Sequence, residues 1–305
     1  MTGDPPPGPP KSPSDDPFAN TRMSLGEHLD ELRTRLIRGV AAVAVAFVIC
    51  WAFQTPLIEF AKRPHYMAMD WLQGDWVEEM EKRLEANPEA ERTEYFLTND
   101  PEDRRIKGFN RDLQLIKTGE GFMFRLKICL YLALIIGAPV LLWQMWGFIA
   151  AGLYDKEKRG IQLYFPISLV AFLVGTSFGY FVMVPYAIYF LNQGSFEIGF
   201  PTFSADAYLK FFASLCLALG IVFQLPLVMT FLARAGVVEP AAMARVRGHF
   251  IVGAFVFSAV LTPPDPFTQA MMGIPVICLY EVGILSSRIV ARKRAARISL
   301  EGGSA

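Results

Sequence analysis

The chain has 305 residues, and its 29 basic and 29 acidic side chains leave no net charge at pH 7. Hydrophobic residues make up 53% of it and charged residues only 19%. The apolar residues fall in long blocks that a soluble core does not need, so the composition excludes an ordinary soluble protein and favours a polytopic membrane protein.

The chain begins with a stretch rich in Pro, Asp and Ser that has almost nothing to bury. We expect residues 1–22 to form a disordered cytoplasmic tail and not a signal peptide, which would need an apolar stretch of its own. A membrane domain is expected over residues 23–292, followed by a second cytoplasmic tail over residues 293–305.

The membrane domain opens on charged residues placed beside the first apolar run. Ser24 and Glu27 have the spacing of a capping box, which predicts the start of a helix. The helix should lie in the membrane interface and continue into the first span, because an apolar stripe runs along it. That stripe consists of Leu25, Leu29, Leu32 and Leu36.

The charges on this helix allow two interpretations. Glu31 and Arg35 are four residues apart, and Asp30 and Arg33 are three apart. Such spacing suits a salt-bridged interfacial helix. Alternatively, a carboxylate such as Glu31 captures a cationic peptide, because a guanidinium can meet a carboxylate with two parallel hydrogen bonds.

Six apolar segments are candidate transmembrane spans, since about 20 residues cross a bilayer core of about 30 Å. Backbone groups must be satisfied inside lipid, so all six are predicted to be helices. The predicted fold class is therefore an all-α polytopic membrane protein. The segments are 36–54, 122–146, 161–184, 207–233, 246–261 and 267–285.

Basic residues are unevenly distributed over the short loops. The loops 192–206 and 262–266 carry none, whereas the segments on the other side carry many. By the positive-inside rule, both termini are expected to be cytoplasmic. The basic residues are Arg22, Arg33 and Arg35 before the first span, Lys156, Lys158, Arg159, Arg234 and Arg245 in two loops, and Arg288, Arg292, Lys293, Arg294 and Arg297 after the last.

A long external insertion over residues 59–118 separates the first two spans. Apolar residues recur in it at spacings of three or four, which predicts a helix that ends near Asn87-Pro88. Its apolar face should pack on the spans or on the lipid interface, and Trp71 and Trp76 suit the interface. The recurring residues are Met69, Leu72, Trp76, Met80 and Leu84.

The sequence LTPPDPF predicts a stiff external hairpin between the last two spans, because its prolines cannot continue a helix. Asp265 should lie at the external surface or pair locally. Spans five and six are expected to be short, and sixteen residues from Val246 to Leu261 would rise only about 24 Å. Local thinning of the bilayer is therefore a further hypothesis.

Cysteine and serine chemistry are not indicated. Cys50, Cys129, Cys216 and Cys278 each fall inside a predicted span, so we expect neither a disulfide nor a metal site. Residues 175–179 fit the G-x-S-x-G pattern of serine hydrolases. Ser177, however, lies about 25 Å beyond the cytoplasmic end of its span, whereas His249 lies at the cytoplasmic end of another span. The two side chains are therefore at opposite depths and cannot form a catalytic pair. Gly175 and Gly179 are better interpreted as a GxxxG helix contact, and no enzyme is expected.

A secondary transporter or channel for a small solute is the alternative function. Prolines in most spans could break helices around a substrate site. Few ionisable groups lie inside the spans, however, and no internal repeat is evident. The prolines are Pro139, Pro166, Pro185, Pro226 and Pro275.

Four ordered motifs resemble the TatC family, the multi-spanning receptor of the twin-arginine protein translocase. HLDELRTRL at 28–36 is similar to the start of that family, and GFIAAGLYDKEKR at 147–159 to its first cytoplasmic loop. LGIVFQLP at 219–226 is similar to its fourth span, and LTPPDPFTQ at 261–269 to its last external turn. The resemblance covers residues 23–292 apart from most of the insertion.

The resemblance implies a site for twin-arginine signal peptides, formed by the acidic residues that match Glu31 and Glu157. Arg33 would orient Glu31 or line the same patch. Phe148 and Tyr154 would supply apolar contact beside Glu157.

Other positions in the motifs carry further expectations. Gln224 stands where many relatives have glutamate, and it would bond a neighbouring helix or contact passing chains. Ala151 replaces the usual proline. The residues that match the family's last external turn are Pro263, Pro264, Asp265 and Gln269.

The family resemblance also implies partners and a location. Single-span TatA/TatB-type subunits would bind near spans five and six, other copies of the chain would assemble with it, and no nucleic acid is expected. The protein would lie in the bacterial inner membrane and use the proton gradient. No cofactor is expected, and no Walker motif is present.

Overall fold

The structure, a computed structural model, describes residues 25–302 except 88, 90, 99, 101, 103, 152–154, 196–197 and 263–264. Side chains are also not described for residues 25, 27–28, 151–163 and 294–302. The predicted tail at 1–22, the cap residue Ser24 and residues 303–305 of the tail predicted over 293–305 therefore lie outside the described part, whereas residues 293–302 belong to the last helix.

The described residues form helices and two isolated β-bridges, Phe96–Ile106 and Gln114–Ser204, which confirms the all-α class. The elements are α1 (Leu25–Ala52), α2 (Gln54–Ala86), η3 (Arg92–Glu94), α3 (Glu120–Ala151), α4 (Asp155–Phe178), η4 (Gly179–Met183), α5 (Val184–Gln193), α6 (Ala205–Val222), α7 (Leu225–Ala235), α8 (Pro240–Arg245), α9 (Arg247–Leu261) and α10 (Pro266–Gly302).

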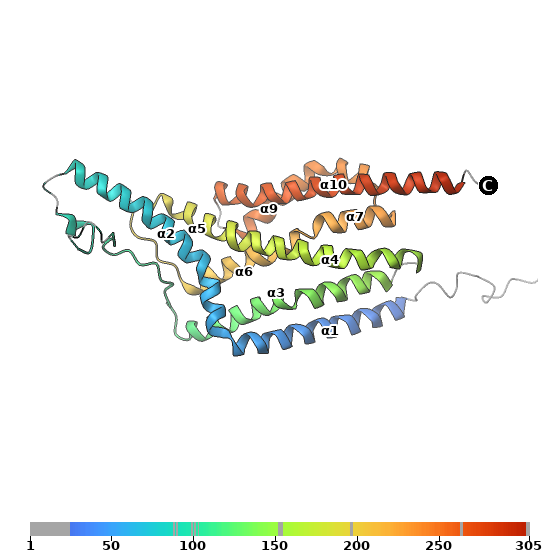
Figure 1. Cartoon of the computed structure of the whole chain (residues 1–305), viewed down its shortest axis with the longest axis horizontal. Coiled ribbons are helices and arrows are strands. Elements are labelled where there is room, and N and C mark those ends of the chain that lie inside the picture. The colour runs from blue at the N-terminus through green and yellow to red at the C-terminus, as the bar shows by residue number, and fades with distance from the viewer. Residues whose placement is uncertain are drawn as a thin grey trace, which may run out of the picture.

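The long helices lie side by side in a bundle (Figure 1). The start of α1 and the end of α10 lie at one end, which we call the terminal end. Helix α2 and residues 87–119 extend from the opposite end, which we call the insertion end (Figure 1). This arrangement agrees with two termini on the same side of a membrane.

Five helical stretches of the described chain are long and apolar enough to cross a bilayer: Leu29–Ala52, Glu120–Ala150, Tyr164–Gln193, Ala205–Ala235 and Pro266–Lys293. Two of them are interrupted. The third contains the π-turn η4, and the fourth breaks at Phe223 and Gln224, just before Pro226. A proline lacks the N–H that would continue the helix ladder across this break.

The predicted fifth span corresponds to α9, whose 15 residues rise about 22 Å. It is too short to count among the five, so a sixth span stays a prediction. The expectation that the last span is short is wrong, because α10 runs for 37 residues. Its sequence turns polar after the apolar segment, but the backbone continues as a helix since nothing there breaks it.

Helix α6 makes close contact with α4 and with the η4 turn that follows it. A Cβ on Gly175 would lie 2.6 Å from the Leu219 carbonyl oxygen, and one on Gly179 would lie 3.0 Å from the Cα of Cys216. Only glycine permits this approach, which confirms the GxxxG interpretation. The four cysteines are free thiols, and Cys50, Cys129 and Cys216 are buried.

The insertion end has a small core of its own. Helix α2 is longer than predicted but ends at Ala86, as expected, and its apolar face is buried against Phe96, Ile106 and neighbouring aromatic rings. The interfacial role expected for Trp76 is wrong, because its ring is 3% exposed and lies 5.4 Å from that of Phe200. Trp71 remains 37% exposed.

A buried carboxylate joins the insertion to the bundle. Glu120 at the start of α3 accepts hydrogen bonds from the backbone N–H groups of Ile116 and Lys117, at 2.7 and 2.8 Å. Its other oxygen accepts from the Ser204 hydroxyl and the Asp206 N–H, each at 3.0 Å. Four donors satisfy the charge, so the carboxylate fixes the end of the insertion to the start of α6.

His65 of α2 is buried beneath the insertion. Its Nε2 lies 2.9 Å from the Arg111 carbonyl oxygen, whereas Nδ1 has no partner in the described structure. Burial lowers the pKa of His65 to about 4, although the Arg111 carbonyl and the Asp112 carboxylate act in the opposite direction. The ring is therefore neutral in the folded insertion.

Acid should loosen the insertion. In the unfolded segment the pKa of His65 is about 6.5, so the unfolded state binds a proton more readily than the folded state. The folded state therefore keeps its full stability above pH 6.5. It loses up to about 3 kcal/mol as the pH falls from about 6.5 to about 4. The measurement is hydrogen exchange of α2 amides across this range, corrected for intrinsic rates. His65→Gln cannot titrate and should show a flatter dependence. Equal pH slopes in the two proteins would contradict the assignment.

Candidate functional site

The predicted site residues come from three helices that meet at the terminal end. Helix α1 packs along α3, and α4 follows α3 after a short connection. Glu31 lies near the start of α1, Phe148 near the end of α3, and Glu157 in the first turn of α4. Tyr154 lies outside the described residues, as does the side chain of Glu157.

The best-defined part of this site is the ion pair of Glu31 with Arg35, which the sequence predicted. Arg35 Nε donates to Glu31 Oε1 at 3.0 Å, and Nη2 contacts the same oxygen. The two side chains are only 21% and 22% exposed. Partial burial reduces screening by solvent and strengthens the attraction, but desolvation of the two charges offsets part of that gain.

The second oxygen of Glu31 is left without a hydrogen-bond donor. Oε2 is buried, and no group in the described part of the chain donates to it. An unsatisfied buried acceptor costs about 1–3 kcal/mol, and more when it is charged. The carboxylate is therefore held in place through one oxygen, and the other has no donor among the described residues.

A glycine on α3 makes room for Arg35. A side chain at Gly147 would overlap the guanidinium of Arg35. The arginine thus crosses from α1 to the last turns of α3, one residue before Phe148. Its positive charge also lies near the carboxyl end of that helix, where the helix dipole favours a cation.

The residue that contacts Glu31 is Arg35 and not Arg33. Arg33 is exposed, and the expected Asp30–Arg33 pair is not formed among the described ion pairs. The expectation that Arg33 lines the same patch stays a prediction. Sequence reasoning found the i, i+4 pair but gave Arg35 no role in the site, because its contact with Gly147 joins residues far apart in the chain.

Gln224 forms a buried interhelical pair. Its Nε2 donates to the Ser168 carbonyl oxygen at 2.9 Å, and its Oε1 accepts from the Ser168 hydroxyl at 2.5 Å. Both residues are buried, at 8% and 0% exposure. The interhelical hydrogen bond expected for Gln224 is present, and a contact with passing chains stays a prediction.

The external turn is closed by Asp265. This carboxylate accepts from the Phe267 and Thr268 N–H groups at 2.8 and 3.1 Å and from the Thr268 hydroxyl, so it caps the start of α10. The predicted local pairing of Asp265 is confirmed. Gln269 donates to the Phe255 carbonyl oxygen of α9 at 3.0 Å. Pro263 and Pro264 lie outside the described residues.

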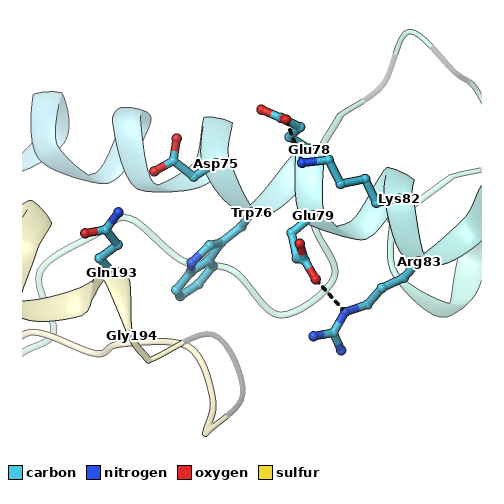
Figure 2. A pocket seen from close by; sticks show the side chains of 8 residues that line it. All are labelled: Asp75, Trp76, Glu78, Glu79, Lys82, Arg83, Gln193 and Gly194. Carbon is cyan, nitrogen blue, oxygen red and sulfur yellow. Dashed lines mark hydrogen bonds and ion pairs between the residues drawn. The ribbon is translucent and has the colours of Figure 1, made fainter.

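A cleft of about 470 Å³ at the insertion end lies between α2 and the end of α5 (Figure 2). Its charged residues pair along α2, Lys82 with Glu78 at 2.8 Å and Arg83 with Glu79 at 3.2 Å. Asp75 accepts a hydrogen bond from Tyr189 at 2.5 Å. These groups stabilise local structure and do not converge on a point where a ligand would sit.

The Gly147 contact predicts an unequal effect of two glycine replacements. Gly74→Ala in α2 has open space around it and should stabilise the helix by about 0.5–1 kcal/mol. Gly147→Ala should gain little, because it displaces the Arg35 guanidinium and breaks the pair with Glu31. Thermal unfolding of the two variants tests this. Equal stabilisation would show that Arg35 does not need the space.

The buried pair predicts a cost for truncating Ser168. Ser168→Ala removes the donor to Gln224 Oε1 and should destabilise the bundle by about 1 kcal/mol. Ser214→Ala is the matched control, since that hydroxyl bonds only the Phe211 carbonyl of its own helix, and we expect less than about 0.5 kcal/mol. Unfolding in mixed micelles measures both, and similar losses would count against an interhelical role.

Comparisons with known proteins agree with this architecture. The sequence model of the family described as Sec-independent protein translocase protein (TatC) matches residues 27–275. The TatC protein of Desulforapulum autotrophicum is 35% identical over 268 residues, which are 88% of this chain and 85% of that protein. The TatC protein of Aquifex aeolicus is 33% identical over 274 residues, which are 89% of this chain and 98% of that protein.

A solved structure also matches. The crystal structure of a twin-arginine translocase receptor, TatC, has a TM-score of 0.65 at 32% identity, and the match covers 87% of this chain and 99% of that one. The chain therefore belongs to the TatC family of Sec-independent protein translocase proteins.

Proposed function

We propose that the chain is the receptor subunit of a twin-arginine translocase and binds twin-arginine signal peptides at its terminal end. One observation carries the proposal: the buried Oε2 of Glu31 lacks a donor, whereas Oε1 is held by Arg35. An arginine of the peptide would supply that donor. Glu157, in the first turn of α4, would take the second arginine.

Arginine suits this site better than lysine. A planar guanidinium can donate to Glu31 Oε2 while Arg35 keeps the other oxygen, because its donors are held in a fixed fork. Charge-assisted hydrogen bonds of this kind are worth about 1.5–3 kcal/mol. In this proposal Arg35 is a positioning residue that keeps the carboxylate oriented.

The proposal extends to assembly and location. The terminal end would face the cytoplasm of a bacterium, with the protein in its inner membrane and the proton gradient as energy source. Single-span TatA/TatB-type subunits would pack near α9 and α10. In support, α9 exposes an apolar row of Val252, Val256 and Val260, which are 64%, 60% and 79% exposed. The short α9 would also thin the bilayer locally.

The test is binding of the purified chain, in nanodiscs, to a twin-arginine signal peptide and to its twin-lysine version. We expect Glu31→Gln and Glu157→Gln each to weaken binding of the twin-arginine peptide about tenfold or more. Asp30→Asn is the matched control, since Asp30 is an exposed carboxylate on the same helix, and it should bind normally.

Equal affinity for the two peptides would contradict the proposal, and so would an equal loss in Asp30→Asn. Uptake of a small solute by vesicles that contain the chain alone would favour the transporter alternative.

A further inference from the structure

A second hollow, which the proposed peptide site does not use, lies between α4, α7 and α10. It is a groove of about 440 Å³. Most of its lining is apolar, and it is lined by Tyr164, Ile167, Ala171, Phe223, Pro226, Leu227, Thr230, Arg234, Leu279, Val282 and Ser286.

The polar groups of this groove fall into two kinds. The hydroxyl oxygens of Thr230 and Ser286 lie 2.5 Å apart, and each also lies within hydrogen-bond distance of a carbonyl of its own helix, that of Pro226 or Gly283. With one hydrogen each, one hydroxyl donates to the other, and that one donates to its own carbonyl. They are therefore satisfied. Arg234 is the one charged residue of the lining, and it is exposed, with its guanidinium 5.8 Å from the centre of the Tyr164 ring. It forms no ion pair with a described carboxylate.

The groove has the depth of one lipid leaflet. It follows α7 from the break at Phe223 to Arg234, close to the helix end at Ala235. The 11 residues of α7 rise about 16 Å, and half of a bilayer core is about 15 Å. Arg234 thus reaches the level of lipid headgroups when Phe223 lies near the middle of the membrane.

The size of the groove distinguishes between possible occupants. A ten-residue helix, about 15 Å long and 10 Å across, occupies on the order of 1,200 Å³, so the groove cannot enclose a helical peptide, which would lie largely outside it. An extended hydrocarbon chain is thin enough to enter. Its apolar surface would replace contacts with the surrounding lipid along Ile167, Leu227 and Val282.

We propose that this groove binds an anionic phospholipid, with one acyl chain between α4, α7 and α10 and the phosphate on the Arg234 guanidinium. A guanidinium can hold a phosphate with two parallel hydrogen bonds, whereas the apolar lining selects the chain and not a free phosphate ion. The bound lipid would fill the space between α4 and α10 in the leaflet at the terminal end.

The experiment is native mass spectrometry of the chain released from nanodiscs that contain equal amounts of phosphatidylglycerol and phosphatidylcholine. The wild-type chain should retain one phosphatidylglycerol at least fivefold more often than phosphatidylcholine. Arg234→Gln should lose this preference. Arg245→Gln is the matched control, because Arg245 is an exposed arginine at the end of α8 and outside the groove.

A second variant tests the acyl chain. Ala171→Phe fills the groove from α4 and should lower retention of both lipids at least fivefold, while thermal unfolding checks that the bundle remains folded. Unchanged lipid retention in folded Ala171→Phe, or an unchanged preference in Arg234→Gln, would overturn the proposal.

A photoreactive amino acid at Ile167, which is 47% exposed, identifies the occupant directly. Cross-links to phospholipid are expected. Cross-links to an added signal peptide in place of lipid would overturn the proposal. The outcome is independent of peptide binding at Glu31, which is measured separately.

Discussion

The architecture depends on the close contact of α4 with α6. Gly175 and Gly179 bring the two backbones together, and the Ser168–Gln224 pair bonds α4 to the α6–α7 junction beyond the glycines. Inside a bilayer the hydrophobic effect does not drive helices together, so close packing and a few interhelical hydrogen bonds must do so. Helices α1 and α3 lie on one side of this pair, and α7, α9 and α10 lie on the other (Figure 1).

The same physical constraint places the charges. An ionised group is costly in hydrocarbon, so the described ion pairs lie towards the two ends of the bundle. At the insertion end, Glu120 has four donors, and Asp206 pairs with Lys127 and Lys210 at 2.5 and 2.7 Å. At the terminal end, Glu31 has a donor among the described residues at one oxygen only. The two carboxylates thus differ in how many of their acceptor sites are filled within the described structure.

Membership of the TatC family also bears on the class of protein to which the chain belongs. The family consists of protein translocase components and not enzymes, and it fits a polytopic helical chain. The G-x-S-x-G pattern, which runs from the end of α4 into η4, is accordingly a packing motif, since its glycines contact α6. The transporter alternative has no comparable support from the comparisons.

The sequence by itself determined the features that depend on neighbours along the chain. Apolar length and the need to satisfy the backbone in lipid give the helices, and i, i+4 spacing gives the Glu31–Arg35 pair and the apolar face of α2. Four motifs were enough to indicate the family.

Only the tertiary structure decided which distant groups meet. Trp76 packs on Phe200 instead of lipid, Gly147 admits Arg35, and Ser168 satisfies Gln224. Local spacing carries no information about these contacts, because each joins residues more than 50 positions apart whose partners depend on how the helices pack. The lack of a described donor to Glu31 Oε2 and the groove beside Arg234 follow from that packing.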